Sequence, residues 1–164
     1  MRIFLDTEFT NFVRPQLISI GLATSDNQYF YVELNTFDRS SCSDFVQQVV
    51  MPQLGKQPDR VMDAERLNLE LTNWLAQFAG NEPVVCYDYD RDWLLLVNAL
   101  RGKIPAWLSH ENIYYQINDL VLEQFRLESG LTDHHALHDA IANQFAFRAA
   151  VGKSVADAKS EGQL

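Results

Sequence analysis

The residues of this chain best suited to chemistry are acids and histidines in three separated segments. Asp6 and Glu8 follow the apolar run Ile3-Phe4-Leu5, aspartates stand at positions 88, 90 and 92, and the histidine-rich segment 134–139 ends in Asp139. If residues 2–6 form a strand, its two-residue period puts Asp6 and Glu8 on one face, about 7 Å apart along the chain. Carboxylates aimed together need a cation, and a pair of divalent metal ions can bridge this separation.

The order of these residues along the chain, D, E, D, H and D, suggests a nuclease. Two divalent ions about 4 Å apart stabilise charge on the attacking and leaving oxygens of a phosphodiester, and Mg²⁺ or Mn²⁺ prefers carboxylate oxygens. We expect Asp6 to bridge the two ions and Glu8 to hold the ion that activates water. A histidine, with an ordinary pKa of about 6.5, can accept the proton of that water.

Helix geometry discriminates among the histidines of the last segment. His134 and Asp139 are five residues apart, about 140° around a helix, so they cannot both project from one helix face. We therefore expect His134 to precede the helix or to sit on its first turn as the general base, with Asp139 one turn deeper as a metal ligand. His138 points about 100° away from Asp139, and His135 is better placed to pack or to face solvent.

The elements that must position these residues alternate along the chain. Period-two and continuous apolar patterns predict strands, and helical spacing with capping residues predicts helices. We expect strands at 2–6, 16–24, 28–34, 84–87 and 113–117, and a loop at 53–60. We expect helices at 43–54, from Asp63 to Gly80, at 92–100, at 120–127, and from a cap at Thr132 or Asp133 to about Val151. This order predicts the α/β class, with a mixed sheet covered by helices.

Composition limits the organisation and the compartment. The chain has 164 residues, 47% of them hydrophobic, and we expect one domain over 1–151 and a polar, disordered tail over 152–164. It has no apolar run of membrane-spanning length, and its two cysteines form no Cys-x-x-Cys pair, so we expect a cytoplasmic protein without membrane contact or disulfides. The net charge of −9 counts against a broad basic surface for nucleic acid, although metal ions can neutralise phosphate locally.

The motifs resemble those of the DnaQ-like, or DEDDh, 3′-to-5′ exonuclease superfamily. The first motif of that superfamily, Asp-x-Glu, matches Asp6-Thr7-Glu8, and its last, His-x-Ala-x-x-Asp, matches the segment from His134 to Asp139. In ribonuclease T-like members the middle motif has Asn four residues before the catalytic Asp, and here that frame puts Asp88 at the Asn position and Asp92 as the ligand. A second frame makes Asp90 the ligand, and both remain open.

The resemblance implies a fold, an activity and a substrate. It implies a ribonuclease H-like fold, a 3′-to-5′ exonuclease that uses two Mg²⁺ or Mn²⁺ ions, and the 3′ end of single-stranded RNA or DNA as partner. RNA is preferred because Asp-Thr-Glu-Phe with Asp-Trp is similar to compact bacterial and phage exoribonucleases. Phe9 or Phe12 is expected to stack on a base, with Thr7 and Asp88 also at the substrate. Related small exonucleases often dimerise, which allows a homodimer here.

Three other functions compete with this interpretation. A zinc hydrolase would use His134 and His138, which are spaced i and i+4, but it leaves Asp6 and Glu8 without a role. A non-catalytic RNA-binding module would keep the fold and lose the chemistry. An endonuclease of the ribonuclease H type would share the sheet and the metal ions, although the last motif favours an exonuclease.

Overall fold

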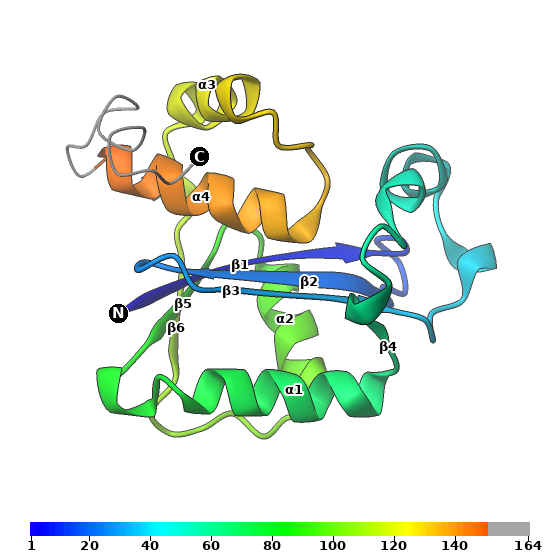
Figure 1. Ribbon diagram of the computed structural model, residues 1–164, viewed down its shortest axis with the longest axis horizontal. Coiled ribbons are helices and arrows are strands. Elements are labelled where there is room, and N and C mark those ends of the chain that lie inside the picture. Colours follow the sequence, from blue (N-terminus) through cyan, green and yellow to red (C-terminus); the bar gives the residue numbers. More distant parts are fainter. Residues whose placement is uncertain (151–164) are drawn as a thin grey trace.

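A mixed six-stranded sheet, described here over residues 1–150 of a computed structural model, forms the centre of the protein (Figure 1). The strand order is β4-β3-β2-β1-β5-β6. The strands are β1 (Arg2–Phe9), β2 (Leu17–Thr24), β3 (Tyr29–Leu34), β4 (Val61–Met62), β5 (Val84–Tyr87) and β6 (Ser109–Asn112). β1, β2 and β3 pair antiparallel, whereas β5 pairs with β1, β6 with β5 and β4 with β3 in parallel. The predicted α/β class and mixed sheet are confirmed.

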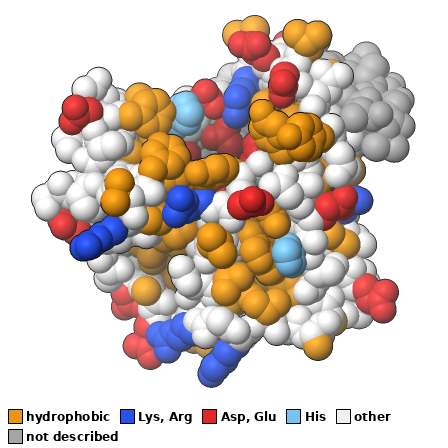
Figure 2. All heavy atoms as spheres, turned by 180° about the vertical axis from the view of Figure 1, so that it is seen from behind, with side chains coloured by type: hydrophobic (Ala, Val, Ile, Leu, Met, Phe, Trp, Pro, Cys, Tyr) orange, Lys and Arg blue, Asp and Glu red, His pale blue; other side chains and the backbone are white. Residues whose placement is uncertain are grey.

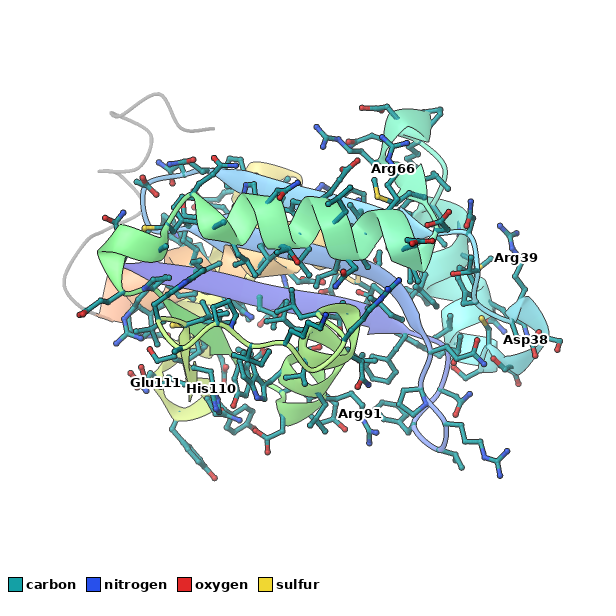
Figure 3. All side chains as sticks on the ribbon, turned by 90° about the horizontal axis from the view of Figure 1, so that it is seen from below. Asp38, Arg39, Arg66, Arg91, His110 and Glu111 are labelled. Atoms are coloured by element: carbon teal, nitrogen blue, oxygen red, sulfur yellow. The ribbon has the colours of Figure 1, made fainter. Side chains whose placement is uncertain are left out.

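Helices cover both faces of this sheet. They are α1 (Ala64–Ala76), α2 (Asp90–Ala99), α3 (Asp119–Ser129) and α4 (Ala136–Ala150). Figure 1 shows α4 on one face with α3 outside it, and α1 on the other face, and Figure 3 shows α1 lying across that face. The tail expected at 152–164, and the helix end expected at Val151, lie outside the described residues. Within the described residues, no helix has both the length and the apolar character needed to cross a membrane.

The two faces of the sheet differ in composition. The face under α1 and α2 is apolar, and its main buried side chains come from β1, β2, β3 and α1: Ile3, Leu5, Ile20, Leu22, Val32, Leu67, Leu71 and Leu75. Because side chains alternate along a strand, the residues between these positions face α4. That face carries Phe4, whose ring lies 5.5 Å from Phe147, and then the acids Asp6 and Glu8. The alternation in β1 thus separates the hydrophobic core from the candidate site.

Capping residues begin α1 and end α3 as their sequences predict, whereas α1 ends at Ala76 instead of at Gly80. The Asp63 side chain accepts a hydrogen bond from the Arg66 amide at 2.8 Å and begins α1. Gly130, at φ 71°, ends α3. Ser43 Oγ accepts from the Val46 amide at 3.2 Å, and the helical segment that follows is a π turn over Val46–Val50 and a 3₁₀ turn over Met51–Gln53. α2 begins at Asp90, two residues before the predicted start.

The strand predicted at 113–117 is wrong. The edge strand β6 is Ser109–Asn112, and Tyr114–Gln116 forms a 3₁₀ turn. β6 is polar because it lies at the sheet edge, where backbone pairing with β5 rather than an apolar side-chain pattern defines it, and Figure 3 labels its His110 and Glu111. Ile113 is apolar because it is fully buried against Phe4 and Cys86. The short strand β4 falls just after the predicted loop and was not predicted.

The cap predicted for the last helix is also wrong. α4 begins at Ala136, and the amide of His135 donates to the carboxylate of Asp139 at 3.1 Å. Thr132 instead bonds His138, with its hydroxyl 2.9 Å from Nδ1. The residues between Thr132 and α4 therefore form a loop at the helix start, which is where His134 was expected to lie.

Candidate metal centre

Neighbouring elements bring the candidate residues to one end of the sheet. Asp6 and Glu8 lie on the α4 face of β1. β5 runs parallel beside β1, and Asp88 follows its last residue. Asp92 lies in the first turn of α2, and Asp139 lies in the first turn of α4. Two parallel strands and two helix starts therefore deliver four acidic segments to the same region.

Gly21 lets α4 come close enough for Asp139 to join the other acids. Gly21 pairs with Asp6 across the β1–β2 ladder and faces α4. A Cβ at this position would lie 2.3 Å from the carbonyl carbon of Ala136 and from the amide nitrogen of Leu137, which is closer than any real contact. The backbone of the first turn of α4 thus occupies the space of a missing side chain.

Two groups of potential metal ligands result. In the first, called the Asp6 group, single oxygens of Asp6, Asp88 and Asp92 all lie within 4.8 Å of one another. In the second, called the Glu8 group, atoms of Glu8, His134 and Asp139 lie within the same limit. These carboxylate oxygens and one imidazole nitrogen could hold metal ions.

The Asp6 group distinguishes between the two candidates for the third carboxylate. Asp92 is 2% exposed, lines the cavity and accepts a hydrogen bond of 2.6 Å from the hydroxyl of Thr7. Asp90 accepts a hydrogen bond of 2.6 Å from Asn112 at the end of β6. Asp92 therefore lies with the other acids, and Thr7 holds it there. Asp88, expected at the substrate, lies within the group as a further possible ligand.

The Glu8 group depends on a loop and an arginine. His134 has a left-handed backbone, with φ 57°, and its Nε2 lies 3.3 Å from Asp133. Arg126 of α3 forms ion pairs with Asp133 at 3.0 Å and with Asp139 at 2.5 Å. The second oxygen of Asp139 accepts from the His135 amide, so Asp139 is held from two sides.

Burial and mutual repulsion disfavour the ionised carboxylates. Burial, with Asp92 and Asp139 nearby, holds the pKa of Asp6 well above its usual value. Burial and neighbouring acids raise the pKa of Glu8 to about 8 and that of Asp92 to about 8. Burial raises the pKa of Asp139 only to about 6, because Arg126 opposes the shift. Bound cations would reverse these shifts, so the electrostatics as well as the donor set fit divalent metal ions.

A cavity of about 490 Å³ opens over both groups and has aromatic walls. Phe9 stacks on Tyr89, with ring centroids 6.4 Å apart, and meets the ring of Phe12 edge-on at 5.3 Å. On the other side Phe45 lies edge-on to His134 at 4.8 Å. Figure 2 shows acidic side chains recessed in a hollow whose rim carries hydrophobic side chains and a histidine. The volume and the mixed lining are those of a ligand pocket.

The other histidines have different surroundings. His138 bonds Thr132, and its ring stacks on His135 with centroids 3.9 Å apart. His135 is 8% exposed and stacks on Tyr31 at 4.5 Å, and burial lowers its pKa to about 4. The pair His134 and His138, on which a zinc site would depend, is therefore divided between the cavity and a packed stack.

Sequence reasoning missed several residues of this cavity. Asn143 lies one helical turn after Asp139, and that spacing is the signal that could have indicated it. Asp88 accepts a hydrogen bond from Asn143, which lowers its pKa against the raising effect of burial. Arg126, Phe45 and Tyr89 carry no pattern in the sequence that marks them, because only the fold brings them to the cavity.

The fold and the site together define an α/β protein with a carboxylate-rich candidate metal centre. Comparisons of the chain with protein-family models and with curated proteins found no match. The residues of the site therefore carry the functional proposal.

Proposed function

We propose that this protein is a metal-dependent 3′-to-5′ exonuclease of the DnaQ-like (DEDDh) superfamily. The observation that carries the proposal is the meeting of Asp6, Glu8, Asp92, His134 and Asp139 around one cavity. These residues come from three distant segments, and they have the types and order of the superfamily motifs. The three antiparallel strands followed by parallel strands with helices between them support a ribonuclease H-like fold for the sheet.

The two ligand groups would hold two ions, Mg²⁺ or Mn²⁺. Asp6, Asp88 and Asp92 would hold one, and Glu8 and Asp139 the other, with Asp6 shared between them. Bound divalent ions supply positive charge to the attacking and leaving oxygens and lower the pKa of water. Thr7 keeps Asp92 oriented through its hydrogen bond of 2.6 Å, so the role of Thr7 lies in positioning a ligand from the opposite face of β1.

His134 would act as the general base. It lies at the start of α4, on the cavity wall, with a ring nitrogen within 4.8 Å of Glu8 and Asp139 oxygens. Its side chain is 42% exposed, so water reaches it, and imidazole is the most common general base in enzymes. Asp133, 3.3 Å from Nε2, would stabilise the protonated ring.

The aromatic walls would hold the 3′-terminal nucleotides. Phe9 and Phe12 line the cavity with Tyr89, and Phe12 is 68% exposed, so its ring is accessible to a base. Stacking on such rings contributes roughly 1–3 kcal/mol per base without reading the sequence. The cavity volume of about 490 Å³ suits the end of a strand better than a continuous duplex. The preference for RNA over DNA rests on the motif resemblance.

The test is trimming of 5′-labelled single-stranded RNA and matched DNA in Mg²⁺, Mn²⁺ or Zn²⁺. We expect a ladder that loses one nucleotide at a time from the 3′ end, faster on RNA, with Mg²⁺ or Mn²⁺ and not after chelation. Internal cuts in a circular substrate would indicate an endonuclease, and activity only with Zn²⁺ would indicate the zinc hydrolase. Retention of the strand without shortening would indicate a non-catalytic binding module.

A further inference from the structure

The backbone of His134 lies in a region of φ and ψ that is uncommon for residues other than glycine. Its φ of 57° lies in the left-handed region, which is costly for a residue with a side chain. Such a conformation persists only where neighbouring contacts fix it. The contacts around His134 therefore determine where its imidazole lies.

Gln53 makes the most direct of these contacts. Its side-chain amide donates to the carbonyl of Asp133 at 2.8 Å and to the carbonyl of His134 at 3.0 Å. It also donates to the carbonyl of Val49 at 3.2 Å, within its own helical segment. The Gln53 side chain thus links the segment before β4 to Asp133 and His134, which lie about eighty positions later in the sequence.

The orientation of the Gln53 amide follows from its acceptors. Three carbonyl oxygens face its nitrogen, and only the NH₂ end of an amide can donate to them. The Gln53 oxygen is buried without a hydrogen-bond partner among the described residues. An unpaired buried acceptor is unfavourable, so the hydrogen bonds of the Gln53 nitrogen to the loop are made while the Gln53 oxygen lacks one.

The segment around Gln53 is itself firmly anchored to the sheet. The amide of Gly55 donates to Glu33 at 2.7 Å, and Glu33, on β3, is 3% exposed. Ser43 caps the helical turn at the other end, and Phe45 from the same turn lies against the His134 ring. Gln53 therefore ties the loop at His134 to a segment that is itself bonded to the sheet.

We infer that Gln53 is a positioning residue for the general base, holding the His134 loop so that the imidazole faces the metal centre. The inference rests on the proposed function for the role of His134. Among the described residues, Gln53 does not line the cavity and its side-chain hydrogen bonds all go to backbone carbonyls, so its effect must pass through the loop. Nothing in the motifs of the sequence indicates it.

The test is Gln53→Leu, which keeps the size of the side chain and removes both donors. We expect kcat to fall roughly 10-fold to 100-fold, since a displacement of about 1 Å can cost 10²-fold, while KM and Mn²⁺ affinity stay nearly constant. In a His134→Ala background the same substitution should change kcat by less than about twofold, because the two residues act as one unit. An equal loss in both backgrounds, or full activity of Gln53→Leu, overturns the inference.

Gln47→Leu is the matched control. Gln47 lies in the same segment and donates to the carbonyl of Cys42 at 3.0 Å. Gln47→Leu therefore removes a comparable hydrogen bond that does not reach the His134 loop. Its kcat should equal that of the wild type. If Gln53→Leu does not fold, Gln53→Asn keeps the donors but shortens their reach, and the same comparison of backgrounds applies.

Amide hydrogen exchange at His134 and His135 separates this inference from the proposed function. Exchange should be faster in Gln53→Leu than in the wild type and unchanged in Gln47→Leu. If the wild type trims neither RNA nor DNA, the proposed function fails and exchange alone decides whether Gln53 holds the loop. Equal exchange rates in Gln53→Leu and the wild type overturn the inference even if the protein is an active exonuclease.

Discussion

The Asp6 group and the Glu8 group lie in one cavity but are built in different ways. The Asp6 group sits on β1, directly after β5, and on the first turn of α2, and Thr7 fixes Asp92 within it. In the Glu8 group, His134 lies on a left-handed loop and Asp139 is shared with Arg126. The Asp6 group thus relies on strand and helix backbone and one side-chain hydrogen bond, whereas His134 and Asp139 of the Glu8 group lie among several side-chain ion pairs.

The two groups also differ in charge compensation. Within the Asp6 group, burial and the neighbouring carboxylates raise the pKa values of Asp6 and Asp92. In the Glu8 group, Arg126 partly neutralises Asp139 and holds its pKa to about 6. Arg126 also lowers the pKa of Asp88 against the effect of burial, but it forms an ion pair only with Asp139 among the candidate ligands described.

The largest effect is expected from breaking the Asp6 group. Asp92→Asn removes one charge from a buried ligand, and we expect loss of one bound ion and turnover below detection. Asp90→Asn is the matched control, because Asp90 bonds Asn112 instead of facing the other acids, and it should retain most activity. Isothermal titration with Mn²⁺ and the trimming assay measure both outcomes. If Asp90→Asn is the inactive variant, the assignment of Asp92 is wrong.

The next largest effect is expected from breaking the Glu8 group at His134. His134→Ala should lower kcat by roughly 10²–10⁴-fold, the usual contribution of general-base catalysis, and should leave the Asp6 group and its ion in place. Metal titration checks the second part. His110→Ala, on the edge strand β6, is the control and should be fully active. Loss of bound ions in His134→Ala would make His134 a ligand instead of a base.

Much of the fold could be predicted because local patterns agree with the tertiary structure. The alternation of β2 and β3, the continuous apolar run of β5 and the Asp63 cap of α1 all follow from side chains near in sequence. The strand β6 and the start of α4 could not be predicted in this way. β6 is defined by backbone pairing with β5, and α4 begins where Asp139 bonds the His135 amide.

In the candidate site, too, some residues could be predicted from local patterns and others could not. The positions of Asp6 and Glu8 on one face follow from strand period alone, and the motif frame gave Asp92 only as one of two alternatives. Arg126, Gln53 and Phe45 reach the cavity or its loop only through tertiary contacts between distant segments. Residues that act through such contacts leave no local pattern, so the sequence indicates the ligands but not what orients them.

A smaller effect is expected from moving α4 without touching a ligand. Gly21→Ala would place a Cβ 2.3 Å from the backbone of Ala136, so the start of α4 must shift. Overpacking of this kind typically costs about 1–3 kcal/mol, and each 1 kcal/mol lowers the Tm by roughly 2–4 °C in a chain of this size. Gly80→Ala meets nothing within 4 Å and should leave the Tm nearly unchanged.

Gly21→Ala also tests whether the two groups are held independently of each other. A shift of α4 moves Asp139 and His134 but leaves Asp6, Asp88 and Asp92 on their own elements. Mn²⁺ titration of Gly21→Ala should therefore show one site weakened and the other close to wild type. Equal weakening of both sites would mean that the two groups are not independently held.

The last effect, on stability alone, is the pH dependence of the metal-free protein. Burial and neighbouring acids raise the pKa values of Glu8 and Asp92 to about 8, far above the range of about 4 expected in the unfolded chain. Between these values the folded state binds more protons than the unfolded state, so the free energy of unfolding falls as pH rises. We expect the Tm measured by calorimetry in EDTA to fall between pH 6.5 and 8.5, and Mg²⁺ to reverse the fall.

Between pH 6.5 and 8.5, His135 no longer opposes the contribution of the carboxyls to the pH dependence of stability. Burial lowers the pKa of His135 to about 4, so between about pH 4 and 6.5 the unfolded state binds more protons at this residue, and its own contribution to stability rises with pH, opposite to that of the carboxyls. Above pH 6.5 the carboxylates dominate, and Glu8→Gln and Asp92→Asn should each flatten the slope. Because burial and neighbouring acids raise the pKa of both carboxyls to about 8, the two variants should flatten the slope by similar amounts. An unchanged slope in both variants would show that other groups cause the fall of the Tm.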